Sequence, residues 1–145
     1  MIDANREREL RLDVEALYFG YRAFTSLPDR ILAEQGLGRP HHRILYFVRR
    51  APGISIGDLL ALLKVSKQAM NRPLRDLESL GLLTIAPDAT DKRIRRVTTT
   101  RKGAQLEARL TGAQLRLLDE VFAGLDVGTE AKWREAMTRL AETDA

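Results

Sequence analysis

Apolar residues recur every three or four positions over most of the chain, and every second position only near its middle. Residues 13–35 carry the first of these stripes, which predicts an amphipathic helix. Gly36 interrupts the pattern, and Pro40 suits the first turn of a second helix over residues 40–51. The apolar positions of the first stripe are Val14, Leu17, Tyr18, Tyr21, Phe24, Leu27 and Ile31.

Two shorter helices are predicted next. Ser55, with Asp58 three residues later, resembles a capping box in which Asp replaces Glu, and an apolar run follows it. Ser66 is the next natural N-cap, and Gly81 is expected to end the helix that Ser66 begins. The residues of this helix expected to face the core are Leu74, Leu77 and Leu80.

The spacing changes to that of strands after Gly81. Residues 82–86 and 94–99 are predicted to be β, the second segment because its side chains alternate in polarity and it leads into the three threonines at 98–100. The residues between them form a turn-rich tip, so the two segments predict a hairpin. The turn residues are Pro87, Asp88 and Asp91.

Helical spacing returns after Gly103, with one long apolar stripe to Leu125 and a shorter one near the C-terminus. The predicted fold class is therefore mainly α with a small β-hairpin (α+β). Residues 36–103 have the element order of a winged helix-turn-helix, in which one helix enters a DNA groove and a ribbon reaches the backbone. The flanking helical regions, 10–35 and 104–145, are expected to belong to the same compact chain.

Positive charge is concentrated in this middle region. The chain of 145 residues has a net charge of +4, yet residues 41–103 hold 13 Lys and Arg against 5 Asp and Glu. A basic middle between acidic flanks favours contact of the middle with a polyanion over a merely solvated surface. Double-stranded DNA is the predicted partner.

The second of the two short helices carries donors suited to a major groove. Gln and Asn pair bidentately with adenine, and Arg and Lys with guanine, whereas Ser66 is better placed to cap the helix and meet a phosphate. Pro73 in the middle of this helix removes one backbone hydrogen bond, and we expect a tolerated bend there. The predicted contact residues are Ser66, Lys67, Gln68, Asn71, Arg72 and Arg75.

The hairpin is rich in arginine at its tip. An arginine there can enter a narrow minor groove, and an adjacent aspartate can hold it by bidentate pairing. Strand alternation predicts Arg93 and Arg95 on one face and Lys92 and Arg96 on the other. The predicted contact residues of the wing are Asp91, Lys92, Arg93, Arg95 and Arg96.

The order and spacing of these features resemble the MarR family of bacterial transcriptional regulators. The resemblance runs from about Leu37 to Gly103 and is most specific in the wing, where Asp91-Lys92-Arg93 precedes Thr100-Arg-Lys-Gly103. Family wings commonly show D-x-R and then L-T-x-x-G. Here Thr99 stands in place of the leucine, and Ile85 stands where many members carry an arginine.

The resemblance implies a homodimeric repressor in which the two flanking regions interleave across a two-fold axis and bind a pseudo-palindromic operator. It also suggests a pocket for a small aromatic acid at the junction of the flanking helices and the DNA-binding lobe. Aromatic walls with an Arg or His would suit such a ligand. The candidate lining residues are Tyr18, Tyr21, Arg22, His41, His42, Tyr46 and Phe47.

Catalysis has little support in the sequence. There are two histidines and no cysteine, and no nucleophile elbow, phosphate loop or metal-ligand cluster is present, so we predict no enzyme, no cofactor and no metal. Neighbours on a helix diverge by about 100°, which favours structural or capping roles for His41 and His42 over a ligand role for one of them, and disfavours a metal site.

Two alternatives to a ligand-responsive regulator stay open: an architectural DNA-binding protein without effector, and a protein-interaction module that does not bind DNA. The second would favour apolar ribbon faces over arginine-rich ones. No segment approaches ~18 uninterrupted apolar residues. The charged start, MIDANREREL, lacks the apolar core of a signal peptide, so a cytoplasmic protein is expected.

Overall fold

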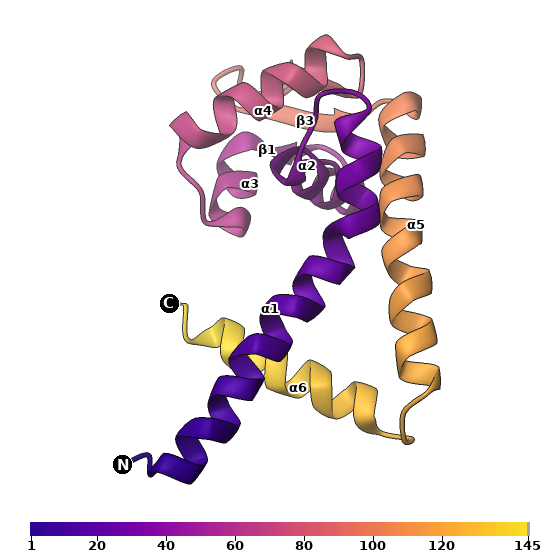
Figure 1. Ribbon diagram of the computed structural model, residues 1–145. Coiled ribbons are helices and arrows are strands. Elements are labelled where there is room, and N and C mark those ends of the chain that lie inside the picture. Colours follow the sequence, from indigo (N-terminus) through magenta and orange to yellow (C-terminus); the bar gives the residue numbers. More distant parts are fainter. Residues whose placement is uncertain (145) are drawn as a thin grey trace.

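The computed structural model describes residues 1–144; residue 145, the last of the predicted C-terminal flanking region, lies outside the described residues. Helices and a small sheet alternate as predicted, which confirms the fold class (Figure 1). The elements are α1 (Ala4–Ala33), α2 (Arg39–Arg50), β1 (Ile54–Ser55), α3 (Ile56–Leu63), α4 (Lys67–Ser79), β2 (Leu83–Pro87), β3 (Arg95–Thr99), α5 (Arg101–Ala123) and α6 (Thr129–Glu142).

Helix α1 begins nine residues before the predicted start at residue 13. The side chain of Asp3 caps the helix by accepting a hydrogen bond from the Arg6 backbone N–H at 2.8 Å. Arg11 pairs with Glu7 one turn earlier at 2.8 Å, and such i,i+4 pairs stabilise an exposed helix. The apolar spacing missed this segment because capping and ion pairs, rather than burial, support it.

The N-caps of the next two helices are those that the sequence predicts. The Ser55 side chain accepts from the Asp58 N–H at 3.0 Å, and the Ser66 side chain accepts from the Ala69 N–H at 3.1 Å. Gly81 adopts a left-handed backbone with φ of +72°, as a residue that follows a helix often does. The prediction for Leu80 was wrong: as the C-cap it lies beyond the last full turn, and its side chain is exposed.

The sheet has three strands in the order β1-β3-β2, all antiparallel. The predicted hairpin is present, with Ile85 opposite Val97, but β1 was not predicted. Only two residues long, β1 has too little pattern to be recognised, and its pairing with β3 is decided by the tertiary fold. Pro87 ends β2 opposite Arg95 and was wrongly assigned to the turn.

One apolar core joins every element except α6. It extends from the last turns of α1 through the winged-helix segment to the first half of α5. The predicted inward residues Leu74 and Leu77 are both in it. Its fully buried side chains are Leu32, Ile44, Leu45, Val48, Leu59, Leu77, Leu82, Val97 and Leu110.

Gly103 marks a close approach between α5 and the start of β2. A Cβ atom at this position would overlap the backbone carbonyl of Leu82. Thr100 caps α5 in the same turn, accepting from the Gly103 N–H at 3.0 Å and donating to the Gly81 carbonyl. The Thr100-to-Gly103 motif therefore docks α5 against the lobe, and no larger residue than glycine fits at Gly103.

Two segments lie outside this core. These segments are residues 1–23 and α6. Every residue from 1 to 23 is exposed except Leu10, which is partly buried, and no residue of α6 is buried. Figure 1 shows the first half of α1 extending away from the lobe, with α6 at the same end of the molecule. Both segments nevertheless carry large apolar side chains, among them Leu17 and Trp133.

Candidate nucleic-acid interface

Helix α4 has one apolar face and one cationic face. Met70, Leu74 and Leu77 are buried against the lobe, so the donors spaced between them point to solvent. Within residues 1–144 these donor side chains make no hydrogen bond or ion pair. The exposed donors are Lys67, Gln68, Asn71, Arg72 and Arg75.

Ser66 has a different role from the other predicted contact residues of this helix. Its hydroxyl oxygen accepts the Ala69 N–H and so caps α4. The free end of α4 still presents backbone N–H groups, and a helix N-terminus attracts anions such as phosphate. Ser66 therefore lies where a DNA backbone could approach.

Helix α4 is uninterrupted despite Pro73, which lies inside it and is partly buried. Since proline has no N–H, the carbonyl of Ala69 loses its normal helical partner. Met70 and Leu74, on either side of Pro73, are both buried in the core, and this burial stabilises the helix around the proline.

The tip of the wing is built around Asp88. One carboxylate oxygen of Asp88 accepts from the backbone N–H groups of Thr90 and Asp91, at 3.1 and 3.0 Å. The other oxygen is paired with the Arg96 guanidinium. The hydrogen bond from Arg96, followed by those from Asp91 and Thr90, holds the pKa of Asp88 well below its usual range. The Asp88 carboxylate therefore stays ionised and holds the turn together.

Arg93 is held in a fixed direction by Asp91. Its Nε and Nη2 atoms lie 3.0 and 3.1 Å from the two carboxylate oxygens of Asp91, the bidentate geometry that the sequence predicted. These hydrogen bonds lower the pKa of Asp91 and raise that of Arg93. The Arg93 side chain is 91% exposed, so Asp91 orients a guanidinium that is otherwise open to solvent.

The predicted division of the wing residues between two faces is only partly right. Strand β3 begins at Arg95, so alternation applies to Arg95 and Arg96, whereas Lys92 and Arg93 lie in the turn. Arg96 also donates to the Gly53 carbonyl at 3.0 Å. Its guanidinium joins the wing to the residue before β1, and this long-range contact could not be predicted from alternation. Lys92 and Arg95 are exposed.

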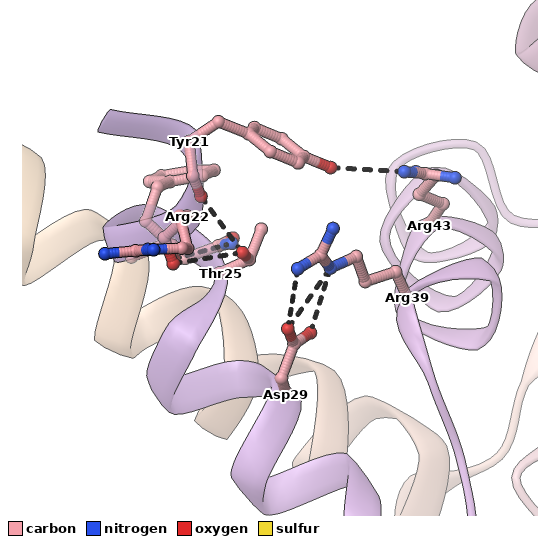
Figure 2. A network of polar contacts seen from close by, with 8 residues as sticks. Tyr21, Arg22, Thr25, Asp29, Arg39 and Arg43 are labelled. Carbon is pink, nitrogen blue, oxygen red and sulfur yellow. Dashed lines mark hydrogen bonds and ion pairs between the residues drawn. The ribbon is translucent and has the colours of Figure 1, made fainter. Parts of the chain in front are cut away.

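A cavity of about 350 Å³ lies at the junction of α1, α2 and α5. Aromatic side chains form much of its wall, and a set of charged groups lies at its edge (Figure 2). Arg39 of α2 holds Asp29 of α1 with contacts of 3.0 and 3.1 Å, and Arg43 donates to the Tyr21 hydroxyl at 3.1 Å. The aromatic lining residues are Tyr21, Phe24, Tyr46 and Phe47.

The cavity includes some of the residues predicted for an effector pocket and not others. Tyr21, His42 and Tyr46 line it, together with Phe47. Tyr18 and Arg22 do not, because they lie on an exposed stretch of α1 where Arg22 stacks over Tyr18 and Phe19. Asp29 and Arg39, which do line it, were missed because their pairing joins two helices.

The two histidines point in different directions. His42 lies in the cavity wall with Nε2 3.2 Å from the Thr111 hydroxyl, and burial lowers its pKa. His41 points away from the cavity into the lobe, where Nδ1 accepts from the Gly38 N–H at 2.9 Å. This bond caps the start of α2, as the structural interpretation of His41 predicted, and explains why His41 does not line the cavity.

Among residues 1–144, no three His, Asp or Glu side chains gather as metal ligands would. No helix in the same range combines the length and apolar character needed to cross a membrane.

The helix-turn-helix of α3 and α4, followed by an antiparallel hairpin with a cationic tip, defines a winged helix-turn-helix protein. Similarity to known proteins identifies the family within this class.

Residues 35–94 match the model of the MarR family. The HTH-type transcriptional regulator PetP of Rhodobacter capsulatus is 44% identical over 108 residues, which are 74% of this chain and 65% of PetP. The match thus spans slightly less than two thirds of that relative's length. The chain belongs to the MarR family.

Solved structures share the fold at low sequence identity. Streptococcus pneumoniae FabT in complex with DNA has a TM-score of 0.81 at 13% identity, with 94% of this chain and 96% of that chain covered. The S. aureus MepR–DNA complex has a TM-score of 0.73 at 16% identity, with 90% and 96% covered. The similarity extends over the flanking helices as well as the winged lobe.

Proposed function

We propose that this protein is a transcription regulator that binds double-stranded DNA in a sequence-specific manner, most simply as a repressor. The observation that carries the proposal is the exposed cationic face of α4 beside a wing whose Arg93 is pre-oriented by Asp91. Pre-orientation reduces the entropy that a side chain loses on binding. PetP is named as a regulator of the same helix-turn-helix type, and FabT and MepR were solved with DNA.

Each element has its own part in this proposal. The α4 donors from Lys67 to Arg75 enter the major groove and contact base edges. Arg93 enters the adjacent minor groove, while Lys92 and Arg95 neutralise phosphates. Arg96, which the sequence placed among the contacts, serves chiefly to fix the wing to the lobe.

The proposed DNA-binding form is a homodimer. The exposed apolar residues of the flanking helices have no core to cover within one chain, and a second copy would bury them. A two-fold dimer places two recognition helices about one helical turn apart, ~34–36 Å, and requires a pseudo-palindromic operator. The exposed apolar residues in question are Leu12, Val14, Leu17, Tyr18, Phe19, Leu115, Val121, Leu125, Trp133 and Leu140.

The test is to select genomic fragments on the purified protein at near-physiological salt and to sequence the retained DNA. A shared inverted repeat with half-sites about one helical turn apart is the expected result. Retention without a common sequence would instead indicate an architectural protein. Failure of a folded dimer to retain any DNA would overturn the proposal in favour of a protein-interaction module.

We also propose that the cavity beside α2 takes a small aromatic acid that releases DNA. Its aromatic walls supply apolar contacts for such a ligand, the Arg39 and Arg43 guanidinium groups supply cationic contacts, and His42 supplies a polar one. Titration of benzoate and larger aromatic acids into the preformed protein–DNA complex is expected to release the DNA.

Two arginine variants make this titration specific. Arg43→Gln removes a cation that lines the cavity, whereas Arg22→Gln removes one in α1 that does not line it. Only Arg43→Gln is expected to weaken the response to the acids. Equal responses from both variants, or no response of the unaltered complex, would argue against an effector site here.

A further inference from the structure

His41 connects the recognition helix to the rest of the molecule. The residue lies in the first turn of α2, its side chain is 11% exposed, and both ring nitrogens have partners. Nδ1 lies 2.9 Å from the Gly38 backbone nitrogen, and Nε2 lies 3.0 Å from Oδ2 of Asp76 in α4. A polar ring with two partners on different elements is better placed to fix an orientation than to fill space.

The direction of these two hydrogen bonds follows from their partners. A backbone N–H can only donate, so Nδ1 of His41 is an acceptor and carries no proton. The neutral ring therefore has its proton on Nε2, which donates to the Asp76 carboxylate. The Gly38 contact selects the tautomer that can hold Asp76.

Among residues 1–144, another directional contact of α4 lies at its C-cap, where Lys102 Nζ donates to the Leu80 carbonyl at 3.1 Å. The inner face of α4 is apolar (Met70, Leu74 and Leu77), and apolar contacts depend less on direction than a hydrogen bond does. Within residues 1–144, the Asp76–His41 bond is the one hydrogen bond between an α4 side chain and another element. It lies one turn after Arg72, beside the groove-facing donors.

The turn that holds α4 also holds α1. Arg39, two residues before His41, is paired with Asp29 of α1 at 3.0 Å (Figure 2). The first turn of α2 is thus attached to α1 on one side and to α4 on the other. In a dimer that forms through α1, the placement of α4 relative to α1 determines how far apart the two recognition helices lie.

We propose that His41 is a positioning residue, which through Asp76 sets the placement of the recognition helix and thereby the half-site spacing that the dimer accepts. The inference rests on the proposed function, since a half-site spacing has meaning only for a dimer on DNA. It adds to that function a residue that contacts no DNA.

Paired substitutions can separate the two bonds of His41. In His41→Asn the side-chain oxygen can replace Nδ1 and keep the Gly38 contact, but the side chain is too short to reach Asp76. In His41→Gln the terminal amide can replace Nε2 and donate to Asp76, while the Gly38 contact is lost. Asp76→Ala removes the acceptor, and Asp76→Asn keeps an oxygen that can accept from Nε2.

The DNA measurement compares each variant's affinity for the selected operator with its affinity for the same half-sites moved one base pair closer or farther apart. The ratio of the affinity for the operator to the affinity for the altered spacing is expected to fall about tenfold in His41→Asn and Asp76→Ala. Loss of one directional hydrogen bond would allow a change of this size. His41→Gln and Asp76→Asn are expected to keep the ratio. A lower overall affinity with an unchanged ratio in His41→Asn would overturn the proposal, because loss of stability alone would have that effect.

Hydrogen exchange of the DNA-free protein tests the same link independently. The backbone amides of residues 74–79 are expected to exchange faster in His41→Asn and Asp76→Ala than in His41→Gln, with α5 unchanged in all three. Equal exchange in α4 would refute a positioning role whether or not DNA is bound. Failure of the unaltered protein to bind any DNA would overturn the proposed function, and the spacing role with it, while exchange still decides whether His41 holds α4.

Discussion

At the scale of single residues, similar side chains of the wing have different tasks because each has a different partner. Arg93 is oriented by its neighbour Asp91 and stays exposed, whereas Arg96 is bound to Asp88 and to the Gly53 carbonyl. A guanidinium that already has two partners within the protein is less available for DNA than one that pairs with a single carboxylate.

Replacement of Arg93 by alanine is expected to weaken operator binding about tenfold or more, because a minor-groove contact is lost. Fluorescence anisotropy with labelled operator measures the effect. Arg134→Ala in α6 is the control, since it removes the same charge far from the wing and should leave the affinity unchanged. Operator binding by Arg93→Ala as tight as that of the control would remove Arg93 from the interface.

Gly103 tests the packing of α5 on the lobe. Gly103→Ala is expected to lower the free energy of unfolding by about 1–3 kcal/mol, because the new methyl group meets the Leu82 carbonyl, which cannot move aside like a side-chain end. Gly112→Ala in the same helix meets only the end of the Arg116 side chain and should stabilise by roughly 0.5–1 kcal/mol. Urea unfolding of both variants measures these changes. An unchanged free energy of unfolding in Gly103→Ala would mean that α5 and the start of β2 can move apart at little cost.

At the scale of elements, the recognition helix combines good caps with one poor interior residue. Ser66 begins it and Gly81 follows it, as both do in ordinary stable helices. Pro73 leaves a backbone carbonyl without its helical partner, yet the helix continues to Ser79. Buried apolar contacts offset the intrinsic cost of proline, which is ~3 kcal/mol in an isolated helix interior.

Pro73→Ala is therefore expected to raise the melting temperature by restoring the hydrogen bond to the Ala69 carbonyl, with an upper bound of about 3 kcal/mol. Differential scanning calorimetry measures it. Arg75→Ala, an exposed change in the same helix, is the control for the helix preference of alanine itself. A melting temperature no higher than that of the control would show that Pro73 costs the helix nothing.

At the scale of the whole molecule, the chain is divided between a packed lobe and two exposed helical segments. The core ends near Leu110, while large apolar residues continue along α5 and α6 and over the first half of α1. An exposed apolar surface of this kind costs free energy in water, and association of two copies would remove it.

Leu17→Glu in α1 is expected to shift the protein toward monomer, because a charge placed in the proposed interface must be desolvated. Leu62→Glu is a control matched in exposure: both leucines are 52% exposed, but Leu62 lies in α3 of the winged-helix lobe and not in α1. Sedimentation velocity across a range of concentrations gives the oligomeric state. A dimer unaffected by Leu17→Glu, or an unaltered protein that is monomeric, would argue against dimerisation through α1.

The sequence alone determined the features that depend on neighbours along the chain. Spacing within one element, or between two adjacent ones, predicts the caps at Ser55 and Ser66, the hairpin and the exposed donor face of α4. Backbone geometry fixes which neighbouring residues share a face. The Asp91–Arg93 pair was predictable for the same reason, since two residues of one turn are always close together.

Only the tertiary structure decided the features that join distant segments. Strand β1, the Arg96 contact with Gly53, the Asp29–Arg39 pair in the cavity wall and the bond from His41 to Asp76 each bring together residues far apart in the sequence. No local pattern encodes such pairs, because their members meet only after the core has set the distance and angle between elements. The physical reason is that propensity and periodicity act within an element, whereas burial of the shared core acts between elements.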